Sequence, residues 1–387
     1  MDIMPIIVDD IECSCMFRYS NKEDIYCIGS RKVDKYFFVN EKASKLYMEV
    51  ISIMDGKHTI EQIKNINWLG EKLPVDVIEK IYQTCLKCNL ITNDTYTDKK
   101  EFNEMEIIFK DIFKINILPF SNFCKKISNK VYIVIIVFML CIMASSLLEI
   151  DQVIDILPWE SITGDIRTLL YAALISSVSL VLHEISHTVA ASKLGLSIKT
   201  AHLAVFAYMS LACYVRLPGI YFLKPKRRIA IWISGSFINF FLIAVAVILY
   251  KFMDGSGQLF LTTLIISNIT IIISALVPFY ISDGYFILAT ICKTPNLRKN
   301  IFINLKNIFY KRKVQLSSFL YIIYFLGTIS FMFFSLVLML PVVNNIIEEY
   351  QNDAGFINIV INNINIFIVL GILLISKMVR LLKIKFK

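Results

Sequence analysis

His183, Glu184 and His187 form an H-E-x-x-H sequence within "LHEISHTVA", residues 182–190, in one of the most apolar stretches of the chain. On a helix, positions i and i+4 share one face, so the two histidines can bind one metal ion. Glu184 lies about 100° around the helix from His183 and can address a water molecule instead. This combination predicts metal-assisted hydrolysis, in which zinc acidifies the water and the carboxylate accepts its proton.

Burial of the motif also favours a metal. Polar side chains inside an apolar helix are costly unless each has a partner. Only four histidines occur in 387 residues, and two of them fall in this pattern. The alternative, a coincidental pair, leaves two imidazoles and a carboxylate to be satisfied in lipid without an ion.

A third metal ligand is expected because a catalytic zinc usually has three protein ligands and an open position. The best candidate is Asp283 in "VPFYISDGYFILA", where a predicted span returns to the side on which the histidines lie. His202 is the next candidate, and His58 lies in a more polar part of the chain. The alternative for Asp283 is a helix-end turn at Asp-Gly.

The composition is that of a polytopic membrane protein. Hydrophobic residues make up 56% and charged residues 18%, and the mean hydropathy is +0.63. The net charge of +9 is explained by the positive-inside bias of membrane proteins, and no basic DNA-reading element occurs, so nucleic acid is not an expected partner. The N-terminus is acidic and lacks the charged region of a signal peptide, so the nine cysteines are expected to be reduced thiols.

Six membrane-spanning helices are predicted from the apolar runs. They cover roughly 130–149, 167–193, 228–251, 258–281, 316–340 and 357–379. Basic segments at 124–130, 224–228, 293–313 and 377–387 alternate with acidic segments at 149–165 and 344–355 and with the loop at 254–258, which carries little charge. This alternation predicts a multi-pass protein of the cell membrane with both termini and the active-site end in the cytosol.

Residues 200–222 form an apolar run that is not read as a seventh span. Lys199 lies on one side of this run and a basic cluster at 224–228 on the other, so a span would separate two basic segments. The content of Val, Phe, Tyr and Leu suits strands. We therefore expect a strand-like or re-entrant element on the cytosolic side.

Three regions follow from the change in composition: a soluble domain at 1–100, a connector at 101–129 and a transmembrane domain at 130–387. The first region has predicted strands at 16–20, 25–30, 35–40 and 89–94. Three helices are predicted between them, with Thr59 and Gln62 as a capping box and Pro74 at the start of the third. This order predicts a small α+β, winged-helix-like domain.

The membrane-embedded H-E-x-x-H, followed two spans later by Asp-Gly, resembles the site-2 protease family of intramembrane zinc metalloproteases. "DGYFIL" followed by "PNLR" is similar to the bacterial peptide zinc metalloprotease branch. The resemblance implies His183, His187 and Asp283 as zinc ligands and Glu184 as the catalytic residue. Residue Val277 departs from the branch, which usually has asparagine before this proline.

The glycine–asparagine motif of that branch appears here as Gly235, Ser236 and Asn239. The resemblance implies that Asn239 aligns an extended substrate. A hydrogen bond between two spans is the alternative for this residue. A close packing contact is expected at Gly235.

The first hundred residues resemble the PqqD-like fold, the recognition element of enzymes that mature ribosomally made peptides. The resemblance rests on "YFFVN", the helix after it and "DGKHTIEQI", and implies leader binding by strand addition. A generic winged helix that binds another protein is the alternative. Cys85 and Cys88 have the spacing of a redox or zinc pair, but they stand alone in a helical pattern.

The expected function is therefore a zinc-dependent intramembrane endopeptidase that cleaves a ribosomally synthesised precursor peptide. Two alternatives remain at this point. One is a site-2-type protease that releases a membrane-bound regulatory factor, and the other is a non-catalytic membrane or immunity protein that binds the peptide.

Overall fold

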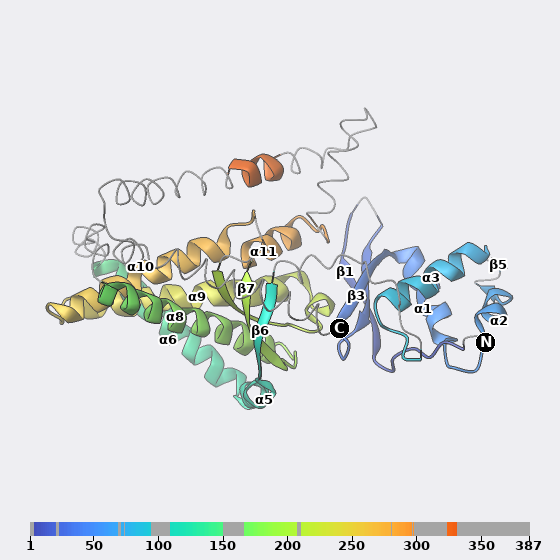
Figure 1. The fold of residues 1–387 in the computed structure, drawn as a ribbon, viewed down its shortest axis with the longest axis horizontal. Coiled ribbons are helices and arrows are strands. Elements are labelled where there is room, and N and C mark those ends of the chain that lie inside the picture. Colours follow the sequence, from blue (N-terminus) through green and yellow to red (C-terminus); the bar gives the residue numbers. More distant parts are fainter. Residues whose placement is uncertain are drawn as a thin grey trace, which may run out of the picture. The chain divides into compact units, whose positions relative to one another are not determined.

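The structure, a computed structural model, describes residues 4–20, 23–68, 71–72, 74–93, 109–149, 166–206, 210–279, 281–295, 297 and 323–330. The chain divides into two compact units (Figure 1). The first unit comprises Met1–Asn103 together with Leu194–Ile198 and Leu217–Ile229. The second comprises Glu104–Lys193, Lys199–Arg216 and Ala230–Lys387.

The first unit contains a three-stranded antiparallel sheet in the order β1-β2-β3. Its strands are β1 (Ile11–Phe17), β2 (Ile25–Ser30) and β3 (Lys35–Asn40). Because β2 is central, β1 and β3 form the two edges of this sheet. A two-stranded hairpin of β4 (Asn67–Trp68) and β5 (Glu71–Lys72) lies later in the chain.

Helices α1 (Glu41–Ser52), α2 (Ile60–Lys64) and α3 (Val75–Lys87) follow the sheet. Asn40 caps α1 by accepting a 2.9 Å hydrogen bond from the backbone N–H of Ala43. Thr59 and Gln62 form the predicted capping box at α2. Such caps satisfy N–H groups that have no partner within the helix, which is why these short helices begin where they do.

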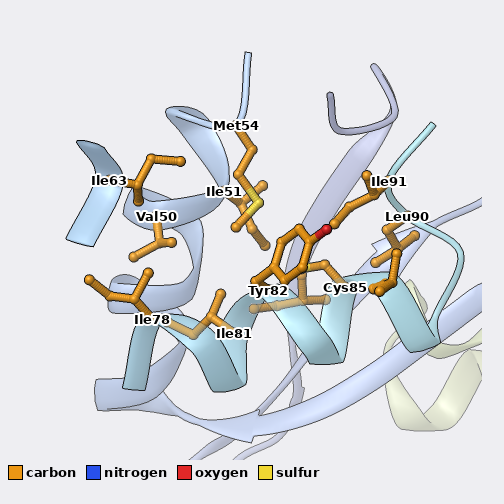
Figure 2. Close-up of a cluster of buried hydrophobic side chains, with 12 residues drawn as sticks. Val50, Ile51, Met54, Ile63, Ile78, Ile81, Tyr82, Cys85, Leu90 and Ile91 are labelled. Atoms are coloured by element: carbon orange, nitrogen blue, oxygen red, sulfur yellow. The ribbon is translucent and has the colours of Figure 1, made fainter. Parts of the chain in front are cut away.

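The core of the first unit lies between α1, α3 and the sheet (Figure 2). Its fully buried members share apolar side chains at helical or strand spacing; they are Ile28, Val50, Ile51, Met54, Ile63, Ile78, Ile81, Tyr82, Cys85, Leu86, Leu90 and Ile91. Burial of each aliphatic side chain contributes about 1.5–3 kcal/mol. This core explains why the first region folds around α1 and α3.

Two strand predictions for the first unit were wrong in their extent. The first strand covers Ile11–Phe17 and not 16–20, because Asp24 accepts a hydrogen bond from the N–H of Tyr19 and turns the chain there. The predicted strand at 89–94 is reduced to one bridge between Ile7 and Ile91. Asn89 has a φ of 51°, so the chain turns sharply after α3 instead of extending.

Among the described residues, four helices are long and apolar enough to cross a membrane. They are α6 (Asn129–Ser146, extended by a 3-10 turn to Glu149), α8 (Ile166–Lys193), α9 (Pro225–Tyr250) and α10 (Ser256–Leu276). Side chains of α6 such as Val134 and Phe138 are apolar and exposed, as expected for a lipid-facing helix. Of the predicted span 316–340 the structure describes only residues 323–330, which are helical. The predicted span 357–379 lies outside the described residues.

A second antiparallel sheet, in the order β6-β7-β8, belongs to the second unit. Its strands are β6 (Phe109–Asn116), β7 (Thr200–Phe206) and β8 (Ser210–Val215). The expectation of strands within 200–222 is confirmed, and η2 (Ile220–Phe222) adds a short 3-10 turn. The segment predicted as a connector contributes β6 and the helix α5 (Leu118–Lys126). The Ser121 hydroxyl on α5 lies 2.7 Å from that of Ser192 on α8, so this segment is part of the packed unit.

Candidate metal centre

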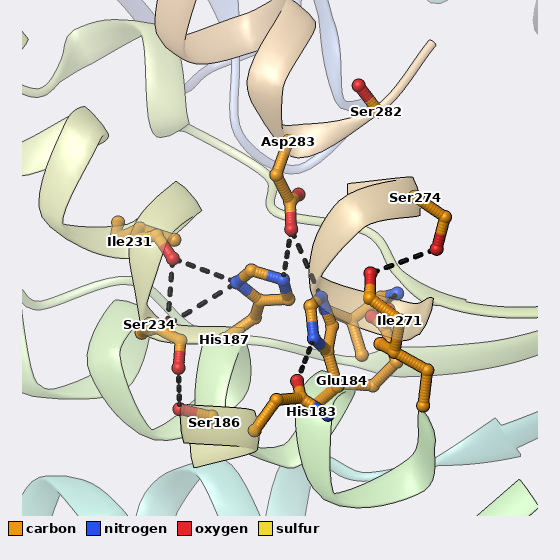
Figure 3. A network of polar contacts seen from close by, with 12 residues as sticks. His183, Glu184, Ser186, His187, Ile231, Ser234, Ile271, Ser274, Ser282 and Asp283 are labelled. Carbon is orange, nitrogen blue, oxygen red and sulfur yellow. Dashed lines mark hydrogen bonds and ion pairs between the residues drawn. The ribbon is translucent and has the colours of Figure 1, made fainter. Parts of the chain in front are cut away.

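Helices α8 and α11 (Asp283–Ile291) supply the side chains of the candidate metal centre. His183, Glu184 and His187 lie within two turns of α8, and their ligand atoms are all within 4.8 Å of one another. Asp283 is the first residue of α11, which begins where the Ser282 hydroxyl accepts a hydrogen bond from the N–H of Tyr285. In Figure 3 the Asp283 carboxylate points between the two imidazole rings.

The two histidines converge on one carboxylate oxygen. His183 Nε2 and His187 Nε2 are each 3.1 Å from Asp283 Oδ2. Both rings are nearly fully buried, with exposed fractions of 4% and 3%. The structure thus brings together the three predicted metal ligands, although Asp283 lies 100 residues after His183 in the sequence.

His187 is oriented by the backbone of α9. Its Nδ1 lies 2.8 Å from the carbonyl oxygen of Ile231, which can only accept a hydrogen bond, so Nδ1 carries the proton. The Ser234 hydroxyl also donates to the same carbonyl at 2.7 Å. The unprotonated Nε2 therefore faces Asp283, as a metal ligand requires.

His183 is oriented by a chain of side-chain amides that ends on a backbone carbonyl. Asn268 on α10 donates from Nδ2 to the carbonyl oxygen of Leu264 at 2.8 Å and to the Ser179 hydroxyl at 3.1 Å. Its Oδ1 accepts from Asn239 Nδ2 at 2.7 Å, and Asn239 Oδ1 lies 2.6 Å from His183 Nδ1. Because the Leu264 carbonyl can only accept, Asn268 Nδ2 must donate to it, and the direction of each further hydrogen bond in this series follows. Asn239 Oδ1 then accepts from the protonated Nδ1 of His183, which leaves Nε2 of this ring unprotonated.

Asn239 is completely buried, and both ends of its amide are engaged by His183 and Asn268. This arrangement corresponds to the alternative considered for it, a hydrogen bond between helices. Among the described residues its amide oxygen contacts His183 and its amide nitrogen contacts Asn268, and its predicted role in substrate binding stays a prediction.

Glu184 is anchored to the second sheet by one of its carboxylate oxygens. Its Oε2 accepts a 3.0 Å hydrogen bond from the backbone N–H of Val215, the last residue of β8. The N–H of Arg216 points instead to Thr200 on the neighbouring strand. Since successive N–H groups of a strand alternate between its two sides, the outer edge of β8 is the one that faces Glu184.

The space beside the two Nε2 atoms depends on a glycine. A Cβ atom at Gly235 would lie 2.4 Å from His183 Nε2 and 2.6 Å from His187 Nε2, well inside normal contact distance. Two imidazole nitrogens and a carboxylate oxygen around such a space form a donor set that suits zinc. The residues present therefore fit a bound zinc ion.

Gly284 lies very close to the backbone of α10, which explains why a glycine follows Asp283. A Cβ at this position would come within 2.0 Å of the carbonyl oxygen of Leu276, the last residue of α10. Only glycine lets the first turn of α11 lie this close to α10. That contact sets the position of Asp283.

The remaining candidate ligands lie elsewhere. His202 is buried with Nδ1 2.8 Å from Asp111 Oδ2 and Nε2 2.9 Å from the Thr200 hydroxyl, so both ring nitrogens are occupied. His58 lies next to Asp55 on the surface of the first unit. Cys85 belongs to the apolar core, where burial raises the pKa of its thiol to about 12, so it is not a thiolate ligand at neutral pH.

Sequence reasoning missed Asn268, Ser179 and the backbone groups of Ile231 and Val215. A polar residue in an apolar span is a signal that could have singled out Asn268. The two backbone groups have no such signal.

Comparisons of the chain with protein families, with curated proteins and with solved structures give no match.

Proposed function

We propose that this protein is a zinc-dependent intramembrane endopeptidase that cleaves a ribosomally synthesised precursor peptide. The observation that carries the proposal is the convergence of His183 Nε2, His187 Nε2 and Asp283 Oδ2, with the Glu184 carboxylate within 4.8 Å of the histidine nitrogens. The N–H of Val215 holds one oxygen of that carboxylate. A bound zinc ion supplies Lewis acidity, which makes water a stronger acid and a peptide carbonyl a better electrophile.

Glu184 is the proposed general base. The N–H of Val215 holds its Oε2, which leaves Oε1 to accept a proton from the attacking water and to pass it to the leaving amine. His183 and His187 cannot share this task, because Asn239 and the Ile231 carbonyl hold their Nδ1 protons. The division of labour supports hydrolysis over a purely structural metal site.

The outer edge of β8 supports an extended peptide substrate. It faces Glu184 and has no strand partner among the described residues. A peptide paired with this edge would place its backbone next to the base, with alternate side chains on opposite faces. Burial of the centre among apolar helices favours substrates that lie within or beside the membrane.

The first unit supports recognition of a leader segment. Its sheet has two outer edges, on β1 and β3, that are unpaired among the described residues. A leader added to one of these edges would raise the effective concentration of the cleavable segment at the centre. Titration of full-length Glu184→Gln with candidate precursors encoded near the gene tests this recognition without turnover.

The activity test compares wild type with Glu184→Gln on those precursors. The amide keeps the shape of the side chain but cannot accept a proton, so cleavage should fall by about 10²-fold or more while zinc stays bound. Surface Glu61→Gln is the matched control, since Glu61 lies in the first turn of α2, far along the chain from the centre. Substantial cleavage by Glu184→Gln would exclude Glu184 as the base.

A further inference from the structure

Arg228, in the first turn of α9, is completely buried within the first unit, with an exposed fraction of 1%. Its Nη2 donates a 3.1 Å hydrogen bond to the carbonyl oxygen of Met16 on β1, and its guanidinium carbon lies 4.7 Å from the centre of the Phe17 ring. Its Nε has no hydrogen-bond partner among the described residues. Arg228 therefore ties the start of α9 to the N-terminal sheet.

Stability does not account for this arginine. A buried guanidinium held by one carbonyl and one ring is costly, and an apolar side chain of similar volume would fill the same space. A cation in the first turn also opposes the helix dipole. The positive-inside bias explains the exposed neighbours Lys226 and Arg227, but Arg228 does not face water or lipid headgroups.

The same helix carries the groups that orient both metal ligands. Three residues after Arg228, the Ile231 carbonyl accepts the Nδ1 proton of His187. Further along α9, Gly235 leaves space for the metal and Asn239 holds His183. Because a helix is stiff over two turns, a clamp on its first turn limits both its rotation and its shift along the axis.

The segment before α9 is held by the same sheet. The N–H of Gly219 donates to the Tyr36 hydroxyl at 2.5 Å, and the rings of Tyr36 and Phe38 on β3 meet the ring of Tyr221 edge to face. Four residues before Gly219, Val215 donates to Glu184. The chain from 217 to 229 is thus anchored at both ends, and each end continues directly into an element of the metal centre.

We propose that Arg228 is a positioning residue of the metal centre: by fixing the first turn of α9 to β1 it sets the Ile231 carbonyl, and with it the His187 ring. The contacts of Arg228 with Met16 and Phe17 then hold the first turn of α9 in place. This inference rests on the proposed function, because it assumes that His183, His187 and Asp283 bind a metal.

The test uses full-length protein in lipid nanodiscs with cobalt in place of zinc, since the visible absorption of cobalt reports the ligand geometry. The variants are Arg228→Met, which fills the space without charge, and Arg228→Lys, which keeps the charge but loses the planar fork. Arg227→Met is the matched control, because it removes an exposed arginine from the adjacent position. Cobalt affinity, the absorption spectrum and the thermal unfolding of the metal-free protein are measured for each.

Arg228→Met should bind cobalt about tenfold more weakly, with an altered spectrum. Its metal-free form should unfold at the same or a higher temperature than wild type, because a buried charge has been removed. Arg228→Lys should also be weakened, and Arg227→Met should match wild type in all three measurements.

The inference is overturned if Arg228→Met binds cobalt as wild type does, or if its weaker binding is accompanied by an equal loss of metal-free stability. Should Arg228→Met not yield folded protein, wild-type affinity and spectrum in Arg228→Lys overturn it as well. Failure of the wild type to bind cobalt would instead refute the proposed function, and with it this inference. The two failures are therefore distinguishable.

Discussion

Gly235→Ala adds a single methyl group at the point where the metal centre has its least space. Relative to an ordinary contact of about 3.4 Å, the new Cβ would be about 1.0 Å too close to His183 Nε2 and about 0.8 Å too close to His187 Nε2. Neither ring can yield freely, since one is held by Asn239 and the other by the Ile231 carbonyl. The methyl group would therefore occupy the space that the proposed metal needs, or would displace both proposed ligands.

The effect on folding should be small by comparison. Alanine is favoured over glycine in a helix by about 1 kcal/mol, whereas overpacking costs about 1–3 kcal/mol. The metal-free variant should therefore lose between about 0 and 2 kcal/mol of unfolding free energy. Loss of one group that supports a metal ligand typically lowers metal affinity by about 10- to 100-fold. Because Gly235→Ala affects both histidines, its zinc affinity should fall by at least about 100-fold.

Chelator competition measures the zinc affinity, and thermal unfolding in excess chelator measures the stability of the metal-free protein. Gly257→Ala is the control, because the atoms nearest to a Cβ there belong to the Met253 side chain and lie at 3.1–3.4 Å. Zinc binding and cleavage at wild-type levels in Gly235→Ala would show that the metal does not lie between these two histidines.

Two further predictions concern residues that support the centre. Asn268→Leu removes the amide that fixes Asn239, so zinc affinity should fall about tenfold, and the unpaired Asn239 amide should cost about 1–3 kcal/mol of stability; unchanged zinc affinity would refute the orienting chain. Burial lowers the pKa of His202 in the folded chain. Below the ordinary histidine pKa of about 6.5, the unfolded chain therefore binds more protons than the folded one, and the free energy of unfolding decreases as the pH is lowered. Hydrogen exchange of β7 and β8 at about pH 7.5 and about pH 5.5 should show this loss in wild type, and His202→Gln should reduce the difference.

The sequence was sufficient to predict that His183, His187 and Asp283 lie together in the candidate metal centre. His183 and His187 are four residues apart on one helix, so helical geometry alone places them together. Asp283 required a further step, the prediction that two spans end on one side of the membrane. The spacing of apolar residues also predicted α1, α2 and α3, because each helix has one apolar face and a recognisable start.

The supporting contacts could not be predicted in the same way. The Ile231 carbonyl and the Val215 N–H are backbone groups, and any residue type at these positions carries them. Arg228 belongs to a basic cluster of the kind that usually lies at the membrane surface, so its burial against β1 is visible only in the packed chain. Strand β6 pairs with β7 across about ninety residues, and such long-range pairing has no local signal.

The zinc content of the purified full-length protein tests the central claim most directly. We predict one zinc ion per chain in wild type and a large loss in His187→Ala and Asp283→Ala, measured by elemental analysis after dialysis against metal-free buffer. Asp254→Ala, which removes an exposed aspartate, should retain the metal. A wild type without zinc, or an Asp283→Ala variant with as much zinc as wild type, would contradict the assignment of these residues as the ligands of a catalytic metal.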